Sequence, residues 1–187
     1  MKTLSKLLIP LIFIGIVPLA MAADDDLENH PGYVDFSGLR AIANIEPTIE
    51  ISLKAPLLNM ITNLIRNEDE ETAAFISKLL RVTVNVFESS AIDVDEVSDS
   101  MNTIAEDLDN QGWERVVRVR EDSDHVDVYF RLSADSQIIH GIAIMVAEPG
   151  DTVLVNIVGD ISVDDISALG KRFDIEELVD IELGNNN

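Results

Sequence analysis

The stretch from Trp113 to Leu132, WERVVRVREDSDHVDVYFRL, carries the pattern that decides the fold. Apolar and charged residues alternate on both sides of the acidic segment 121–124, EDSD. Alternation with a period of two is typical of strands that bury one face, and a short polar segment between two such runs favours a hairpin turn. We therefore expect two antiparallel strands here, joined at residues 121–124.

A second pair of strands follows, in residues 138–147 and 152–159, with Pro149-Gly150 as the turn signal between them. Upstream, shorter runs rich in β-branched and aromatic residues predict further strands. These runs are residues 33–36, 48–53 and 82–87. Asn156 interrupts the apolar run VLVNIVG, and we expect a backbone group to satisfy its amide, at a sheet edge or beneath a helix.

Between the strands, apolar residues at helical spacing predict helices. Pro56 opens the first, Asn67 with Glu70 resembles a capping box for the second, and Asp93 with Glu96 resembles one for the third. The apolar stripes are Leu57, Leu58, Ile61, Leu64 and Ile65; Phe75, Ile76, Leu79 and Leu80; and Val97, Met101, Ile104 and Leu108. Two short helices are predicted to begin at Ser162 with Asp165 and at Asp174 with Glu177.

Early helices followed by a run of hairpin strands predict the α+β class rather than alternating α/β. We expect a single domain over residues 33–183, built on a mostly antiparallel sheet of five to six strands with helices packed on one face. Residues 23–32 predict a flexible leader, and residues 184–187, GNNN, predict a disordered tail.

The first 22 residues have the layout of a secretory signal peptide. Lys2 and Lys6 give a positive start, residues 7–19 are apolar, and residues 20–22, AMA, form a small-x-small exit. The apolar run of thirteen residues is shorter than the roughly 20 that span a bilayer. We expect export, cleavage after Ala22 and a periplasmic location, with secretion as the alternative. An uncleaved membrane anchor is the other interpretation of this segment.

The chain of 187 residues is strongly acidic, with a formal net charge of −22 from 35 acidic and 13 basic residues. Loss of Lys2 and Lys6 with the signal peptide takes the charge to −24, from 35 acidic and 11 basic residues. Such a surface repels nucleic acid and anionic lipid, so we expect no nucleic-acid partner and no stable membrane insertion after cleavage. Cysteine is absent, which excludes disulfides and thiolate metal sites.

If the hairpin is symmetric about its loop, residues whose numbers sum to 245 lie opposite each other. One face then holds apolar pairs, and we expect it to be the buried face. Its members are Val117, Val119, Val126 and Val128, continued by Trp113 and Phe130. The other face holds Arg118 opposite Asp127, Glu114 opposite Arg131, Val116 opposite Tyr129 and Arg120 opposite His125.

The arginines of this second face have two interpretations. Opposite charges on neighbouring strands stabilise a hairpin by about 0.2–1 kcal/mol per pair and help to fix its register, which favours a ladder of internal ion pairs. Alternatively, Arg118, Arg120 and Arg131, with Tyr129, are a candidate contact site for an anion or a partner protein.

No motif predicts a catalytic, cofactor-binding or metal-binding residue. His30, His125 and His140 do not share the helical spacing of zinc proteases, and no acidic cluster has the spacing of a calcium loop. The sequence also lacks a Gly-x-Ser-x-Gly elbow and a phosphate-binding glycine loop. His140 lies in an apolar strand, where we expect a packed, hydrogen-bonded side chain. We therefore expect no cofactor and no metal.

The second half of the chain resembles the bacterial domain-of-unknown-function family 4252. The residues that carry the resemblance are LDNQGWERVVRVRED, VDVYFR, GIAIMVAEPGDTVLVNIVGDIS and ISALGKRF. The resemblance covers about residues 30–182 and implies a small exported protein of envelope-bearing bacteria, with some relatives encoded near extracytoplasmic-type sigma factors. It implies no activity, cofactor or site residue.

These observations favour an exported periplasmic protein that acts as a non-enzymatic interaction or envelope-sensing module, with another envelope protein as its partner. The alternative is a small hydrolase or metal-dependent periplasmic enzyme that uses His125 or His140 with a nearby aspartate.

Overall fold

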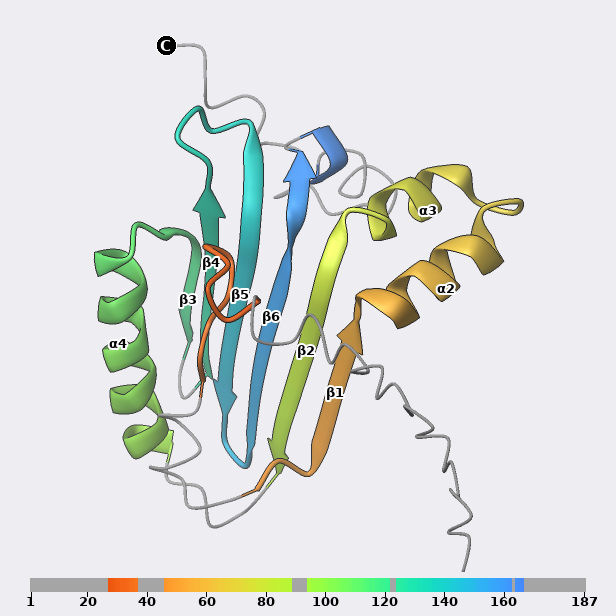
Figure 1. Ribbon diagram of the computed structural model, residues 1–187. Helices are drawn as coiled ribbons and strands as arrows, with labels where there is room; N and C mark the ends of the chain where they lie inside the picture. The colour runs from red at the N-terminus through yellow and green to blue at the C-terminus, as the bar shows by residue number, and fades with distance from the viewer. Residues whose placement is uncertain (1–26, 37–45, 89–93, 122–123, 163, 167–187) are drawn as a thin grey trace, which may run out of the picture.

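The computed structural model describes residues 27–36, 46–88, 94–121, 124–162 and 164–166. Its centre is one sheet of six strands in the order β1-β2-β6-β5-β4-β3, and every neighbouring pair is antiparallel (Figure 1). The strands are β1 (Ile49–Lys54), β2 (Leu79–Glu88), β3 (Glu114–Glu121), β4 (Asp124–Leu132), β5 (Ile138–Glu148) and β6 (Asp151–Ser162). The helices are α2 (Ala55–Ile65), α3 (Glu70–Ile76) and α4 (Val94–Asn110). The α+β class and the antiparallel sheet are confirmed.

The helices divide between the two faces of the sheet, which corrects the expectation that they pack on one face. The apolar stripe of α4, with Met101 and Leu108, packs against Phe87, Met145 and Leu154. Leu58 of α2 and the partly buried Phe75 and Ile76 of α3 pack against the opposite face. That second cluster contains Leu79, Phe130, Ile139, Ile142, Ile161 and Ile166. Alternate residues of a strand point to opposite faces, so strands rich in apolar residues at both parities supply two clusters.

The two hairpins are joined into a meander in which β3, β4, β5 and β6 pair in sequence order. The pairing of Glu121 with Asp124 confirms where the first hairpin reverses, and the second turn is confirmed at Pro149-Gly150, where Gly150 adopts the left-handed conformation with φ at 93°. The β1–β2 pair joins the meander along β2 and β6, which are not successive strands.

Helix α3 is shorter than its apolar spacing predicts. Its N-cap is Asp69, whose Oδ1 accepts a hydrogen bond of 3.0 Å from the Thr72 amide, so the expected Asn67 cap is wrong by two residues. Leu79 and Leu80 belong to β2 and not to the helix, because pairing with β6 begins at Leu79. The Ser162–Asp165 cap is confirmed, since the Ser162 amide donates to Asp165 Oδ2 at 2.9 Å.

Other predicted segments lie outside the described residues or differ from expectation. The predicted signal peptide, the helix at Asp174 and the tail fall outside the described residues, as do the side chains of Asp93 and Glu96. Residues 33–36 form no strand. The Val34 amide instead donates to Asn156 Oδ1 at 3.1 Å, so a side chain replaces the ladder partner. No helix of the described ranges combines the length and the apolar character needed to cross a membrane.

Residues 27–36 lie across the α4 face of the sheet, where Val34 and Phe36 enter the core beside Trp113 (Figure 1). Gly32 crosses β5 in direct backbone contact, and a Cβ placed on it would lie 1.8 Å from the His140 carbonyl oxygen. Only glycine fits such an approach. Asn156 fixes the crossing, because its Nδ2 donates to Gly32 O at 3.0 Å and to Ile142 O at 3.2 Å.

The expectation that backbone groups satisfy Asn156 is confirmed. Asn156 lies in β6, an inner strand, beneath residues 27–36 rather than at an edge or under a helix. The contact brings the N-terminal part of the described chain, including His30, onto the sheet.

Candidate functional site

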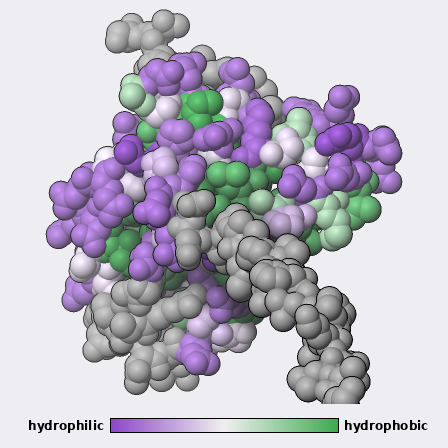
Figure 2. All heavy atoms as spheres, viewed as in Figure 1, coloured by the Kyte–Doolittle hydropathy of each residue, from purple (hydrophilic) through white to green (hydrophobic). Residues whose placement is uncertain are grey.

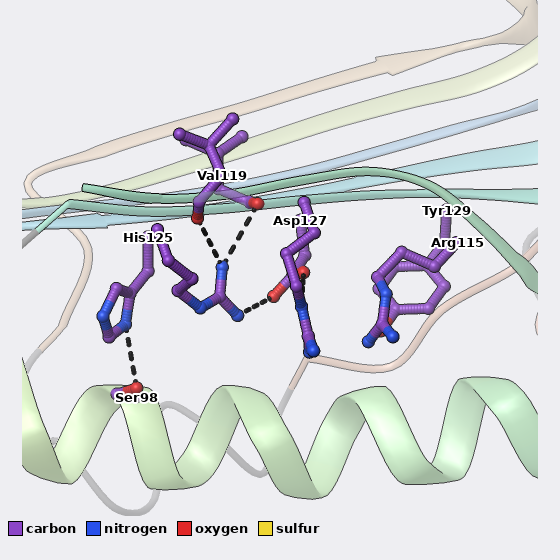
Figure 3. Close-up of polar contacts among 9 residues, drawn as sticks. Ser98, Arg115, Val119, His125, Asp127 and Tyr129 are labelled. Atoms are coloured by element: carbon purple, nitrogen blue, oxygen red, sulfur yellow. Dashed lines mark hydrogen bonds and ion pairs between the residues drawn. The ribbon is translucent and has the colours of Figure 1, made fainter.

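The predicted register of the arginine hairpin is confirmed from Val117 to Glu121, where paired residue numbers sum to 245. Arg118 Nε donates to Asp127 Oδ1 at 3.2 Å, and Arg120 Nη2 donates to Asp127 Oδ2 at 2.5 Å (Figure 3). One carboxylate, only 1% exposed, therefore binds two guanidinium groups. Arg120 Nη1 also donates to Val119 O and Val126 O, so both backbones of the hairpin hold this side chain.

The orientation of the hairpin is the reverse of the prediction. The charged face lies against α4, and the valine face points away from it: Val119 is 41% exposed (Figure 3). Trp113 and Phe130 belong to opposite clusters and do not continue one apolar face. The paired guanidinium groups and carboxylate satisfy each other's charge, so a helix can cover them without leaving an unpaired ion.

A β-bulge shifts the outer end of the hairpin. Val116 is the extra residue, so Arg115 and not Val116 pairs with Tyr129, and Glu114 pairs with Phe130 instead of Arg131. The bulge turns Arg115 to the charged face, where its Nη1 donates to Tyr129 Oη at 3.1 Å and its guanidinium lies 5.8 Å from the ring centroid. Burial raises the pKa of Tyr129, and the bond from Arg115 opposes this rise. The bond to Tyr129 raises the pKa of Arg115.

The structure brings together three of the four predicted contact residues. Arg118, Arg120 and Tyr129 line the charged face, where an internal partner faces each of them. Arg131 lies at the other end of the hairpin, where Nη1 donates to Gly112 O at 3.0 Å and Leu132 O at 3.2 Å. The anion or partner contact stays a prediction, and the geometry favours the ladder of internal pairs.

Arg131 also lines a pocket of about 830 Å³ between residues 27–36 and the C-terminal half of α4. Its lining carries acidic groups and one histidine beside this arginine. The charged and titratable residues of the lining are His30, Arg131, Glu28, Asp35 and Asp107.

His125 contacts the helix that covers the charged face. Its Nδ1 lies 2.8 Å from Ser98 Oγ of α4 (Figure 3). The described contacts of His125 therefore tie β4 to α4, which is a structural role. His140, the other histidine of the alternative enzyme hypothesis, contacts His30 and Asp160 instead.

His140, His30 and Asp160 form a cluster that sequence spacing did not predict. His140 Nδ1 is 2.9 Å from Asp160 Oδ1, and the His30 ring meets the His140 ring edge-on at a centroid distance of 5.8 Å. One potential ligand atom from each residue lies within 4.8 Å of the other two. His140 is hydrogen-bonded, as expected, although Asp160 is 64% exposed, so the cluster opens to solvent.

The electrostatics of this cluster favour neutral His30. Burial lowers the pKa of His30, with Asp160 acting in the opposite direction and His140 lowering it further. The Gly32 amide donates to His30 Nδ1 at 3.1 Å, which orients the ring. No periodicity links residue 30 to residues 140 and 160. The only sequence signals were Gly32 and Gly141, whose meaning depends on a backbone crossing that spacing does not reveal.

Comparison with known proteins gives one family. A family model described as Domain of unknown function (DUF4252) matches residues 44–169. None of the curated proteins compared with the chain matches it.

Proposed function

The chain belongs to the DUF4252 family, and from this premise we propose that it is an exported, non-enzymatic interaction module that binds a protein in the cell envelope. The proposed partner presents an apolar surface bordered by Lys and Arg. The observation that carries the proposal is the part of the sheet face beyond the α2–α3 cluster, where the described chain leaves aliphatic side chains half-buried or exposed.

This face, here called the open face, consists of two rows of aliphatic residues that cross all the strands. The first row is Ile51, Val84, Val155, Ile144, Val128 and Val117. The second is Ile49, Val86, Val153, Val146, Val126 and Val119. None of these side chains is buried, and Ile49, Ile51 and Val119 are each more than 40% exposed. A contiguous exposed apolar surface of this kind marks an interaction site.

The exposed apolar surface extends onto α2. Leu57, Met60 and Leu64 follow helical spacing on its outer side, and Leu64 is 70% exposed. Hydrophobic residues lie at the surface in the region of α2 (Figure 2). The helix thus buries Leu58 against the sheet and presents a second apolar stripe outward.

Charge at the border of the open face indicates the kind of partner. The next row beyond the second aliphatic row is acidic and exposed, and is here called the acidic row. It consists of Glu88, Asp151 and Glu148, which are paired across three strands, and of Asp124 paired with Glu121. Like charges directly opposite each other destabilise a sheet, so a basic partner would remove a cost that the free protein carries.

The same charge disfavours two other occupants. A second cleaved copy, with 35 acidic and 11 basic residues, would bring a further net charge of −24 and a second acidic row to the interface. The negative net charge and the acidic row of this chain would both repel an anionic lipid surface. A partner with basic residues around an apolar patch is the chemistry that complements this surface.

Export and periplasmic location are part of the proposal, supported by the charged start, apolar run and AMA exit of the first 22 residues. Intact-mass measurement of protein from the envelope fraction tests this point. A chain that begins at Ala23 is the expected result, and a cytoplasmic chain that retains Met1 would contradict it.

Site-specific photo-crosslinking in cells tests the interaction. A photoreactive residue at Ile51 or Val119, on the open face, should give a discrete product with another protein. The same residue at Asn102, exposed on α4, is the matched control and should give none. Charge reversal by Asp151→Lys should weaken the product at both positions.

The identity of the crosslinked protein distinguishes a basic partner from a second copy of this chain. A partner identified by mass spectrometry with a basic border around an apolar patch would support the proposal. Products formed within the same chain or with a second copy, or equal products at Asn102, would overturn it.

A further inference from the structure

Three segments that are distant in sequence converge at His30, His140 and Asp160. His30 comes from residues 27–36, His140 from β5 and Asp160 from β6. His140 Nδ1 and Asp160 Oδ1 are 2.9 Å apart, and the three potential ligand atoms lie within 4.8 Å of one another. A tetrahedral site with metal–ligand bonds of about 2.0–2.1 Å separates its ligand atoms by about 3.3 Å. The cluster therefore needs only a small closure around an ion.

The donor set points to a particular class of metal. Two imidazole nitrogens and one carboxylate oxygen suit zinc and its neighbours in the first transition row, whereas calcium and magnesium prefer oxygen donors alone. We propose that His30, His140 and Asp160 form a binding site for a divalent metal ion of the zinc class. The site is separate from the open face, so its test is independent of the proposed function.

His140 lies at an irregularity in the pairing of β5 with its two neighbours. The β4–β5 register skips His140, which makes it the extra residue of a β-bulge, and the β5–β6 register is irregular at the same place. Bulges re-aim side chains and recur beside functional sites.

The backbone crossing at Gly32 and Gly141 brings His30 to the same place. A Cβ on Gly141 would lie 2.4 Å from Gly32 O, and a Cβ on Gly32 would lie 1.8 Å from His140 O. The two glycines allow an approach that any larger residue would prevent, and Asn156 bonds hold it from below. Tertiary contacts therefore hold His30, the third potential metal ligand, beside His140 and Asp160.

Metal binding would exchange one hydrogen bond at His30. The Gly32 amide donates to His30 Nδ1 at 3.1 Å. A metal on Nδ1 would take the lone pair that accepts this bond, and a metal on Nε2 would require the neutral ring to carry its hydrogen on Nδ1. Either nitrogen therefore releases the Gly32 amide, and the ion replaces that bond as the tie between residues 27–36 and the sheet.

Zinc binding to the purified full chain tests the site. Calorimetry with metal-free protein, in excess magnesium and calcium to occupy non-specific carboxylates, should show one zinc per chain. His30→Gln and His140→Gln should each weaken zinc binding by at least about tenfold, and Asp160→Asn should also weaken it. His125→Gln, at the histidine bonded to Ser98, is the matched control and should bind zinc as the parent chain does.

A measurement on the unsubstituted chain guards against variants that fail to fold. Zinc should shift the ring nitrogen resonances of His30 and His140, and the amide resonance of Gly32, while those of His125 stay in place. Equal affinity in His140→Gln, zinc binding that ignores both histidine variants, or shifts confined to His125 would each overturn the proposal.

Discussion

The two faces of the sheet differ in how completely other parts of the chain cover them. The face covered by α4 contains Asn85, Asp127, Thr152 and Asn156, all nearly inaccessible to solvent. The open face carries two rows of aliphatic residues of which none is buried. On the covered face the charged groups are paired within the Arg118–Asp127–Arg120 triad, and Asn156 is hydrogen-bonded to backbone groups. Within the described residues, the chain covers the polar groups of one face and leaves the aliphatic rows of the open face half-buried or exposed.

The largest expected difference between the faces is in packing. Leu154→Ala on the covered face should lower the free energy of unfolding by about 3–4 kcal/mol, because Leu154 is fully buried. Ile144→Ala removes the same number of carbons from a half-buried position in the open face and should lower it by about 1–2 kcal/mol. Urea unfolding of the two variants measures both values. Equal losses would mean that the open face is as tightly packed as the covered one.

The next effect concerns the charges under α4. Asp127→Ala should lower the free energy of unfolding by about 2 kcal/mol, because two partly exposed guanidinium groups lose the buried carboxylate that they share. Arg118→Ala should cost about 1 kcal/mol or less, since Arg118 is 44% exposed and Arg120 still neutralises Asp127.

A double-mutant cycle checks this asymmetry. The Arg118→Ala/Asp127→Ala protein should lose less stability than the sum of the single losses, because both changes remove one shared interaction. Additive losses would show that the pair does not interact in solution.

These charges also show where the sequence was informative. Period-two alternation predicted the hairpin and its register from Val117 to Glu121 correctly. It did not predict which face would be covered, because α4 reaches this face through tertiary contacts of Met101 and Leu108. The bulges at Val116 and His140 were equally invisible, since one extra residue changes local pairing without changing composition. The histidine cluster depends on the backbone crossing that brings His30 onto the sheet, so spacing alone could not reveal it.

A smaller effect, of opposite sign, is expected at the border of the open face. Asp151→Asn should raise the free energy of unfolding by about 0.2–1 kcal/mol, because Asp151 lies directly opposite both Glu88 and Glu148. Added salt should reduce the gain by screening the repulsion. Thermal unfolding at two salt concentrations measures it, with Glu106→Gln on α4 as a charge-matched control. Destabilisation by Asp151→Asn would disprove repulsion in the acidic row.

The smallest effect is expected at the Lys78–Asp165 ion pair, whose carboxylate is more exposed than that of Asp127. Burial raises the pKa of Asp165, but hydrogen bonds from Lys78 and Ser162 outweigh it and hold this pKa below its ordinary value. A lowered carboxyl pKa contributes stability above the ordinary value of about 3.9, and this contribution is lost as pH falls through the folded-state pKa.

Asp165→Asn should therefore lower the free energy of unfolding at neutral pH by about 1 kcal/mol or less, as Lys78 is 37% exposed. The difference from the parent chain should shrink as the pH falls below the ordinary carboxyl pKa. Urea unfolding across this pH range measures it. A difference that grows towards acid would contradict the assigned direction.

The pairing of β2 with β6, which are far apart in sequence, affects the order in which the strands should fold. Residues 114–162 pair strictly with their neighbours in sequence, so this meander closes only short loops. The β2–β6 pairing joins residues that are far apart in the chain. It therefore costs more chain entropy to form than the pairings within the meander. We therefore expect the meander to nucleate folding and residues 49–88 to dock onto it late. In pulsed hydrogen exchange, amides of β4 and β5 should gain protection before those of β1.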